Sequence, residues 1–329
     1  MSSVLSIHAR PGGPLQPLVG RSPAIELART RIQRFAGSPL PVLLVGPTGS
    51  GKEVLAQHLH AFSGRDGELV DVNCGALPRD MIESLLFGHR RGAFTGAAES
   101  TVGLVARAHH GTLFLDELAS LPPEGQAKLL RVLESGEFLR LGDAEKRWAD
   151  FRVVAAVQDD IEARVEAGLF RRDLYYRVAG FRITLPPLSK RREDIAPLAE
   201  YFAGIQGCSL SAEAAPVLIG RPWPGNVREL RMTIDRAAAL ADGPVLDAQV
   251  IASAIGETAE SLDGAGAARG NPALAALREE LMQVCLAHRG RSASMAAALG
   301  ISRATLFRRL RACGLSLEGF RVSRSPTSR

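Results

Sequence analysis

A single stretch decides the fold: Val42-Leu43-Leu44-Val45-Gly46-Pro47-Thr48-Gly49-Ser50-Gly51-Lys52-Glu53. Its leading apolar residues predict a buried strand, and the glycines that follow predict a tight loop. Lys52 then opens a run whose apolar residues have helical spacing, so we expect a helix there. A strand, Gly-x-x-x-x-Gly-Lys and a helix, in this order, form an arrangement that binds phosphate chains. The sequence therefore predicts a nucleotide site rather than a chance glycine-rich turn.

The loop supplies the expected contacts with the nucleotide, ATP. Its glycines allow backbone N–H groups to turn toward a phosphate chain, and the helix N-terminus adds partial positive charge. Lys52 should reach the β- and γ-phosphates. The next position usually carries a Ser or Thr whose hydroxyl meets Mg²⁺, but here it is Glu53. The predicted nucleotide-binding residues of this stretch are Gly46, Pro47, Thr48, Gly49, Ser50, Gly51, Lys52 and Glu53.

A second apolar strand, Gly111-Thr112-Leu113-Phe114-Leu115, runs directly into two carboxylates, Asp116 and Glu117. A buried strand seldom ends in two acids unless a cation lies nearby, although solvated acids at an ordinary strand end are the simpler alternative. Beside a phosphate-binding loop, we expect Asp116 to hold Mg²⁺ through water and Glu117 to polarise the attacking water. ATP and Mg²⁺ are therefore the expected cofactors.

Strand-like and helix-like segments alternate up to residue 185, which predicts an α/β fold with a parallel sheet. Further strands are expected at residues 68–72, 153–157 and 181–185, with ligands at the carboxyl ends of the sheet. Residues 137–141 and 148–152 flank a polar turn around Gly142 and Asp143, which predicts a hairpin or loop insertion. After Pro186 and Pro187, residues 192–255 predict helices only.

The C-terminal part carries an excess of positive charge. The whole chain has a net charge of +5, whereas residues 288–329 contain nine arginines and one acid, which gives +8 and leaves 5 − 8 = −3 for the rest. Two short helices at residues 292–299 and 302–313, joined at Gly300, have helix-turn-helix spacing. A basic helical oligomerisation bundle is the alternative. The predicted DNA-binding residues are Ser302, Arg303, Thr305, Arg308 and Arg309.

The composition also argues against a disulfide-bonded, membrane-spanning or exported protein. The four cysteines lie far apart without metal-ligand spacing, so we expect isolated thiols in a reducing compartment. No stretch is apolar for long enough to cross a membrane, and residues 1–17 lack the apolar core of a signal peptide. A cytoplasmic protein is therefore expected.

One motif connects these features to a known family. Gly92-Ala93-Phe94-Thr95-Gly96-Ala97 is identical to the sigma-54-contacting loop of the bacterial enhancer-binding proteins, the AAA+ activators of sigma-54 RNA polymerase. The chain resembles this family over residues 19–256, and residues 274–315 resemble its Fis-type DNA-binding end. Further matching segments are Asn73-Cys74, residues 111–117, 170–177 and 185–188, and Trp223-Pro224-Gly225-Asn226-Val227-Arg228-Glu229-Leu230.

The resemblance implies an ATPase that assembles as a homo-oligomeric ring, a hexamer by analogy, on enhancer DNA. Hydrolysis would remodel the closed promoter complex of sigma-54 RNA polymerase. Asn73 would be the switch that holds Glu117 away from water, and Arg171 and Arg177 would reach a neighbour's γ-phosphate. Arg228 would be the second nucleotide sensor. The segments expected are a disordered leader (1–17), an AAA+ α/β core (18–188), a helical lid (189–256), a linker (257–272), a helix-turn-helix (273–315) and a basic tail (316–329).

The sequence departs from the family pattern in four respects. Val157-Gln158 replaces Thr-Asn at the first sensor, Arg90 replaces a Glu before the loop, and Pro47 replaces an acid. No receiver or ligand-sensing domain precedes the core, so control would come from a separate regulatory protein, from expression level or from nothing. Two rival functions follow: a DNA-binding scaffold with a decayed ATPase, and an AAA+ remodelling chaperone.

Overall fold

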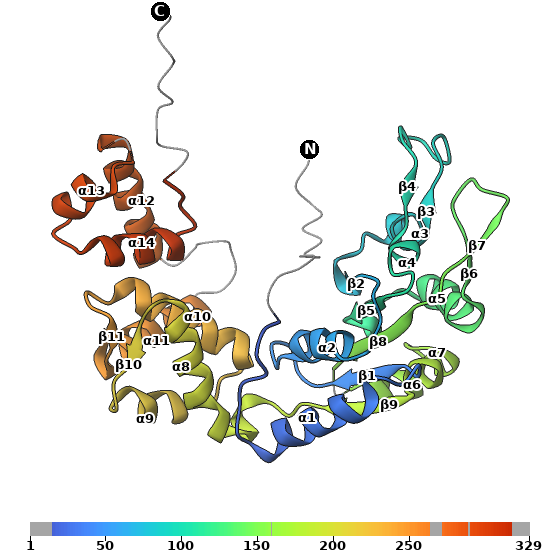
Figure 1. Ribbon diagram of the computed structural model, residues 1–329, viewed down its shortest axis with the longest axis horizontal. Helices are drawn as coiled ribbons and strands as arrows, with labels where there is room; N and C mark the ends of the chain where they lie inside the picture. Colours follow the sequence, from blue (N-terminus) through green and yellow to red (C-terminus); the bar gives the residue numbers. More distant parts are fainter. Residues whose placement is uncertain (1–14, 159, 264–271, 289, 318–329) are drawn as a thin grey trace, which may run out of the picture. The chain divides into compact units, whose positions relative to one another are not determined.

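The computed structural model describes residues 15–158, 160–263, 272–288 and 290–317 (Figure 1). The chain divides into two units, Met1–Lys190 and Arg191–Arg329. This division falls close to residue 188, where the sequence predicts the end of the α/β core. The predicted leader lies largely outside the described residues, as does most of the predicted basic tail.

The first unit is built on a five-stranded sheet in which all neighbouring strands are parallel. In spatial order the strands are β2 (Leu69–Asn73), β5 (Thr112–Asp116), β8 (Arg152–Val157), β1 (Val42–Val45) and β9 (Phe181–Thr184). Leu43 and Val45 of β1 belong to one hydrophobic core, and Val42 and Leu44 belong to the other. Because alternate side chains leave opposite faces of a strand, a sheet covered on both faces needs continuous apolar runs. The predicted parallel α/β sheet is confirmed.

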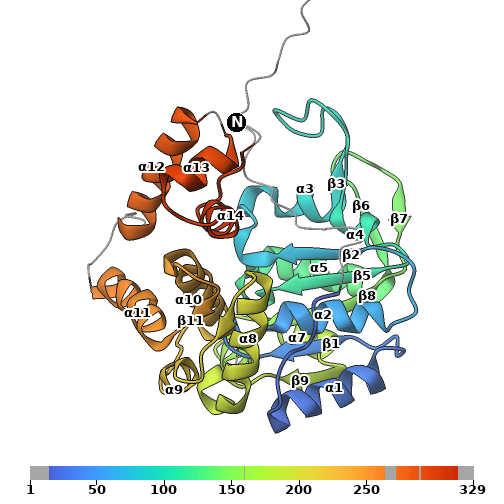
Figure 2. The same cartoon turned by 60° about the vertical axis from the view of Figure 1, so that its left-hand side comes forward.

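Helices cover both faces of this sheet (Figure 2). The core of one face contains side chains of α1 (Pro23–Phe35) and α2 (Lys52–Ala61). The core of the other face is completed by α3 (Ile82–Phe87), α4 (Leu104–Arg107), α5 (Pro123–Ser135), α6 (Ile161–Glu166) and α7 (Arg172–Val178). Short 3₁₀ turns occur at η1 (Cys74–Ala76), η2 (Arg79–Met81), η3 (Leu118–Ser120), η4 (Leu188–Lys190) and η5 (Arg192–Asp194).

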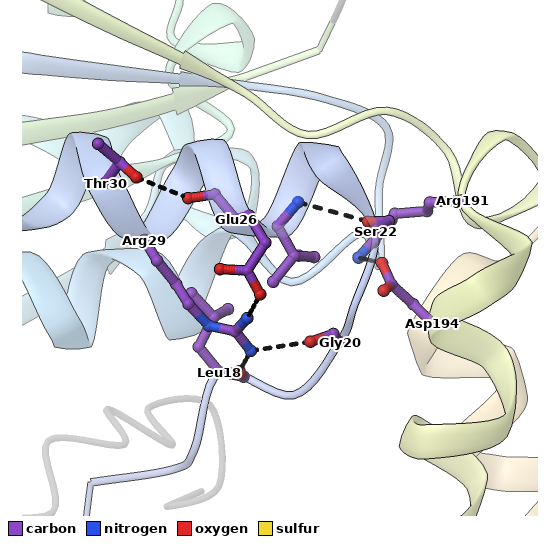
Figure 3. Close-up of polar contacts among 9 residues, drawn as sticks. Leu18, Gly20, Ser22, Glu26, Arg29, Thr30, Arg191 and Asp194 are labelled. Atoms are coloured by element: carbon purple, nitrogen blue, oxygen red, sulfur yellow. Dashed lines mark hydrogen bonds and ion pairs between the residues drawn. The ribbon is translucent and has the colours of Figure 1, made fainter.

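The entry to α1 is held by side chains of the helix itself (Figure 3). Ser22 caps the helix, since its Oγ accepts a hydrogen bond from the N–H of Ile25 at 3.4 Å. Nη2 of Arg29, further along the helix, donates to the carbonyls of Leu18 at 2.5 Å and Gly20 at 2.9 Å. One guanidinium therefore binds the preceding loop to the helix.

Two β-hairpins project from one end of the first unit in Figure 1. One consists of β3 (Gly88–His89) and β4 (Thr101–Val102), and residues 90–100 connect the two strands. The other consists of β6 (Glu137–Leu139) and β7 (Lys146–Trp148). The predicted hairpin around Gly142 is therefore confirmed, although its strands are short.

The second unit begins with the helices α8 (Ile195–Ile205), α9 (Ala214–Ile219), α10 (Asn226–Leu240) and α11 (Ala248–Asp263), which we call the lid. The prediction of helices only is wrong at one point, because β10 (Ser209–Leu210) and β11 (Val245–Leu246) form a parallel pair. Strands of two residues are too short to show a period in the sequence. The predicted linker also begins too early, since α11 includes Gly256 and continues to Asp263 through residues 257–263, which contain neither Gly nor Pro.

Three further helices follow: α12 (Pro272–Ala287), α13 (Ser292–Ala298) and α14 (Arg303–Ala312). They enclose a small core of their own, and its buried side chains include Leu281, Met295, Leu306 and Leu310. The four cysteines are unbonded, as the sequence predicts, and all four are buried. Throughout the described part of the chain, no helix has the length and apolarity that a bilayer crossing requires.

Candidate nucleotide-binding site

Four functional segments meet at the carboxyl edge of the sheet. The parallel register places Val45 of β1 beside Val157 of β8, and Asn73 of β2 beside Asp116 of β5. The glycine-rich loop leaves β1 at this edge, and Gln158 directly follows β8. Ligands of open parallel sheets bind at this edge, because the loops there can surround them without interrupting the strands.

The conformation of the glycine-rich loop depends on its glycines. Gly49 has φ +75° and Gly51 has φ +105°, which are left-handed values that side chains disfavour. A Cβ on Gly46 would lie 2.4 Å from the carbonyl oxygen of Leu185. Gly51 precedes α2 without a side-chain cap, so no side chain competes for the first N–H groups of this ten-residue helix. Such a helix start favours an anion.

The ammonium group of Lys52 is held against this loop by hydrogen bonds. Its side chain is buried, and Nζ donates hydrogen bonds to the carbonyls of Gly46 at 2.7 Å and Pro47 at 3.0 Å. A buried ammonium group needs hydrogen-bond acceptors, and these two carbonyls hold Nζ at the loop. The position therefore suits the phosphate oxygens for which the sequence predicts Lys52.

Gln158 lies next to the same loop. Its Nε2 donates to Oγ1 of Thr48 at 3.4 Å, so the amide at the predicted first-sensor position does reach the phosphate-binding loop. Gln158 thus links the end of β8 to the loop.

Asn73 and Glu117 meet at Gly75. Oδ1 of Asn73 accepts hydrogen bonds from the N–H groups of Gly75 at 2.9 Å and Ala76 at 3.1 Å. A Cβ on Gly75 would lie 2.4 Å from Oε2 of Glu117. Within the described contacts, no hydrogen bond joins the two side chains directly. The predicted switch therefore remains a prediction, although the two residues share one contact point.

The backbone around Glu117 is unusual. Glu117 has φ +52° and ψ +40°, a left-handed conformation that is rare for a residue with a long side chain. Its N–H donates to Oδ1 of Asp116 at 2.9 Å. Residues held in this region cluster at active sites, where the strain aims a side chain. The pair of acids predicted from the sequence is thus built into one tight turn.

Sequence reasoning missed Asp71, a third acid of this edge. Burial raises the pKa of Asp71 to about 7, and the charges of Glu53 and Asp116 contribute to this rise. Its Oδ1 is buried and has no hydrogen-bond partner among the described residues. The sequence does contain a signal for this residue, because Asp71 is an acid inside the predicted strand that ends at Asn73. Among the described residues no three Asp, Glu, His or Cys side chains are grouped as a metal site, but a cation here would relieve the mutual repulsion, and Mg²⁺ stays a prediction.

The two predicted arginine fingers have different surroundings. Arg171 is exposed and forms a two-pronged ion pair with Asp173, with Nε–Oδ1 and Nη2–Oδ2 distances of 3.0 and 2.6 Å. The hydrogen bond from this guanidinium to the carboxylate raises the pKa of Arg171. Arg171, Arg172, Asp173 and Tyr176 line a surface hollow. Arg177 instead donates from Nε to the carbonyl of Leu133 at 2.8 Å, near the end of α5.

The turn at residues 92–97 is closed by its own backbone. The N–H of Gly92 donates to the carbonyl of Ala97 at 2.9 Å, and the N–H of Ala97 donates to that of Phe94 at 3.0 Å. Gly92 and Gly96 have φ of +82° and +102°. Phe94 is 40% exposed and meets the ring of His89 edge-on, and Thr95 is exposed. The two side chains predicted to contact a partner are therefore accessible.

The base of this turn is tied to the β6–β7 hairpin. The N–H of Arg90 donates to the carbonyl of Leu141 at 3.0 Å, and Nη1 of Arg90 lies 3.6 Å from Oδ1 of Asp143. A Cβ on Gly142 would lie 2.9 Å from the Cβ of Ala93. The departure from the family pattern at Arg90 thus has a local partner of opposite charge.

The remaining predicted residues lie in the second unit. Arg228 is exposed in the first turn of α10, and its sensor role stays a prediction. Oγ of Ser302 accepts a hydrogen bond from the N–H of Thr305 at 3.1 Å, and exposed Arg303 donates to Oγ of Ser292 at 2.9 Å. Thr305 and Arg308 are buried, and Arg309 is half-buried.

Residues 18–184, more than half of the chain, match the family described as the sigma-54 interaction domain, and residues 189–267 match the AAA+ ATPase lid domain. The chain belongs to the sigma-54 interaction domain family. Membership of this family confirms the expected AAA+ core and helical lid. It also identifies the protein as a relative of transcriptional regulators.

Several relatives of this sigma-54 interaction domain protein are similar over most of its length. The phenol regulator MopR of Acinetobacter guillouiae is 41% identical over 89% of the chain and 55% of its own length. The regulator NtrC of Rhizobium meliloti is 35% identical over 94% of the chain and 72% of its own length. The chain thus spans about half of the length of some curated relatives.

The fold is also similar to solved structures. The structure of NtrX from Brucella abortus in complex with ATP has 31% sequence identity and a TM-score of 0.65, and the match covers 91% of this chain and 70% of that one. The same protein in complex with ADP gives a TM-score of 0.66 at 30% identity.

Proposed function

We propose that this protein is an ATP-dependent activator of sigma-54 RNA polymerase. It binds enhancer DNA, assembles as a homo-oligomeric ring and uses ATP hydrolysis to remodel the closed promoter complex. The observation that carries this proposal is the coexistence, in one unit, of the site around Lys52 and the exposed turn at residues 92–97. The first can hydrolyse a nucleotide, and the second can contact a partner.

At the nucleotide site, each residue has a role that its position supports. The N–H groups of the loop and Lys52 bind the phosphates of ATP, while Gln158 stays against Thr48 near the terminal phosphate. Asp116 would hold Mg²⁺ through water, and the bound ion would supply positive charge against the charge that develops on the transferring phosphoryl group. Glu117 accepts the proton of the attacking water, and Asn73 positions Glu117 through their shared contact at Gly75.

A ring completes the site. Arg171 is exposed, and its carboxylate partner Asp173 holds the guanidinium in one orientation beside a surface hollow. A guanidinium supplied by a neighbouring subunit stabilises the transferring phosphoryl group and makes hydrolysis depend on assembly. Arg177, whose Nε donates to the carbonyl of Leu133 in α5, supplies the second guanidinium to the neighbour's γ-phosphate. Arg228 of the lid acts as the second nucleotide sensor.

The exposed turn and α14 provide the two partner surfaces. Phe94 offers an aromatic anchor and Thr95 a hydroxyl to sigma-54, since exposed aromatic side chains commonly dominate interface energetics. Arginines of α14 and its exposed neighbour Ser302 meet the phosphates and base edges of enhancer DNA. The contact of Gln158 with Thr48 argues against a decayed ATPase, and the turn at residues 92–97 argues against a remodelling chaperone.

The decisive experiment is open-complex formation on a supercoiled sigma-54 promoter. Purified chain, sigma-54 RNA polymerase and template are combined with ATP or with a non-hydrolysable analogue, and unpaired thymines are footprinted. We expect the promoter DNA to melt with ATP but not with the analogue. If ATP hydrolysis is measurable but the promoter stays closed, the protein is an ATPase of another kind. Without hydrolysis, the scaffold function is favoured instead.

A further inference from the structure

The C-terminal end of α10 is capped by side chains of α14. The last carbonyl groups of a helix have no partners within it, so they bind donors from elsewhere, and cationic donors are favoured by the helix dipole. Nη2 of Arg308 donates to the carbonyl of Ala241 at 2.8 Å, and Nε of Arg309 donates to that of Ala239 at 3.2 Å. The two guanidiniums thus bind α14 to the lid.

Three more contacts close this interface. Nη1 of Arg308 lies 3.3 Å from Sγ of Cys208, and Nη2 of Arg309 lies 3.1 Å from Oδ1 of the exposed Asp242. Oγ1 of Thr305 lies 3.5 Å from the carbonyl oxygen of Asp242. The Arg308 residue is 8% exposed and the Arg309 side chain 16% exposed. In this docked state both side chains are directed to the lid.

The docked side chains lie on a different face of α14 from its own core. Leu306 and Leu310 are buried within the core of α12, α13 and α14, whereas Arg308 and Arg309 face the lid. The three-helix cluster can therefore leave the lid without losing its core. Nε of Arg308 is buried and has no hydrogen-bond partner within the described part of the chain, which lowers the stability of the docked state.

We infer that the lid and DNA compete for the same surface of α14, so that the docked chain is autoinhibited for DNA binding. This inference rests on the proposed DNA-binding function. In the docked state the Arg308 residue is 8% exposed and the Arg309 side chain 16% exposed, so guanidiniums that bind the carbonyls of Ala241 and Ala239 are not accessible to DNA phosphates. Apparent DNA affinity is then reduced by the fraction of molecules in which α14 is docked. Exposed Arg303 instead donates to Ser292 within the three-helix cluster, so its contact does not depend on docking.

The thiol of Cys208 reports the docked state directly, because Arg308 covers it. The full chain is pulsed with iodoacetamide at low salt, with and without a saturating mixed-sequence DNA duplex, and modified peptides are quantified by mass spectrometry. We expect the duplex to raise the modification rate of Cys208 several-fold. Cys74, buried in the first unit, is the internal control and should keep its rate. A duplex that saturates the chain while Cys208 stays protected would overturn the inference.

A lid variant tests the competition from the other side. Asp242→Ala removes the ion pair with Arg309 but leaves the DNA-contacting side chains intact. Because an exposed ion pair contributes little, we expect duplex affinity to rise by about two- to fivefold. Glu200→Ala, which removes another exposed acid of the lid, is the matched control for overall charge. An equal gain in both variants would indicate a general charge effect and contradict competition.

Two arginine variants separate this inference from the function on which it rests. Arg303→Ala should weaken duplex binding and keep Cys208 protected without DNA, whereas Arg308→Ala should expose Cys208 without DNA. If the wild-type chain does not bind the duplex even at low salt, DNA binding itself is refuted and the inference is refuted with it. Binding with Cys208 still protected refutes the inference alone.

Discussion

The carboxylate of Glu117 occupies the space that a side chain on Gly75 would need: a Cβ built there would lie 2.4 Å from Oε2. The carboxylate is at the end of a flexible side chain, so Gly75→Ala should move it without unfolding the protein. A displacement of about 1 Å at a reacting group can cost on the order of a hundredfold in rate. We expect ATP turnover to fall by roughly ten- to a hundredfold, with ATP affinity retained.

Steady-state hydrolysis and fluorescent-nucleotide binding measure the two effects of Gly75→Ala separately. Gly37→Ala is the control, because no atom of the described residues would contact the added Cβ within 4 Å. Unchanged turnover in Gly75→Ala would mean that Glu117 does not act from the position described.

Lys52 and Glu117 should affect different steps. Lys52→Ala removes the buried ammonium that is held on the loop carbonyls, so both binding and turnover should be lost. Glu117→Gln keeps size and polarity but loses the base, so binding should persist while turnover falls by about a hundredfold or more. Nucleotide titration and phosphate release distinguish the two. Turnover like that of the wild type in both variants would contradict the assigned site.

The two fingers should differ in stability as well as in activity. Arg177 binds the carbonyl of Leu133 near the end of α5, so Arg177→Ala should lower Tm and activity together. Arg171 pairs only with exposed Asp173 among its described ion pairs, so Arg171→Ala should lower turnover at unchanged Tm. Mixing either variant with Lys52→Ala should restore some hydrolysis if the fingers act in trans. Activity independent of protein concentration, without rescue on mixing, would exclude that role.

The raised pKa of Asp71 predicts that the stability of the protein depends on pH. Burial, with Glu53 and Asp116, raises its pKa from 3.8 to about 7, so the folded state keeps the proton to higher pH than the unfolded state does. Ionisation of Asp71 therefore opposes folding, and the wild type should lose stability relative to Asp71→Asn as pH rises toward 7. Denaturant unfolding from about pH 5 to about pH 8, with EDTA and without nucleotide, measures this. If the difference in unfolding free energy between the two proteins does not change with pH, the pKa of Asp71 is not raised in the folded state.

Thr95→Ala tests the exposed turn. The change removes one exposed hydroxyl and leaves the backbone hydrogen bonds at Gly92 and Ala97 in place. We expect unchanged hydrolysis, assembly and duplex binding, but loss of sigma-54 capture in a pull-down with ATP analogues. Thr30→Ala, at an exposed threonine of α1, is the control. Normal promoter opening by Thr95→Ala would show that the contact lies elsewhere.

Local pattern was sufficient for the parts of the site that are contiguous in sequence. The strand before Gly46, the helix at Lys52 and the acids after Leu115 follow from apolar runs and their interruptions, and the parallel sheet follows from their alternation. Family resemblance added roles for isolated residues such as Asn73. The strand ends do meet at one edge of the sheet, whereas the role of Asn73 stays a prediction.

Long-range contacts could not be predicted in this way. The raised pKa of Asp71 depends first on its burial and then on Glu53 and Asp116, which approach it only through the sheet and α2. Likewise, nothing in the sequence around Arg308 indicates that its guanidinium binds the carbonyl of Ala241. A basic helix has the same pattern whether its arginines face a nucleic acid or the end of another helix.

The attachment of Arg90 to Leu141 and Asp143 has a consequence for protein engineering. The six-residue motif at residues 92–97 stands on a support that the chain supplies some fifty residues later, in the β6–β7 hairpin. Transplanting the motif alone onto an unrelated AAA+ scaffold would therefore transfer its sequence without the contacts that support it. The transferable module consists of two separate segments, and a graft should include both.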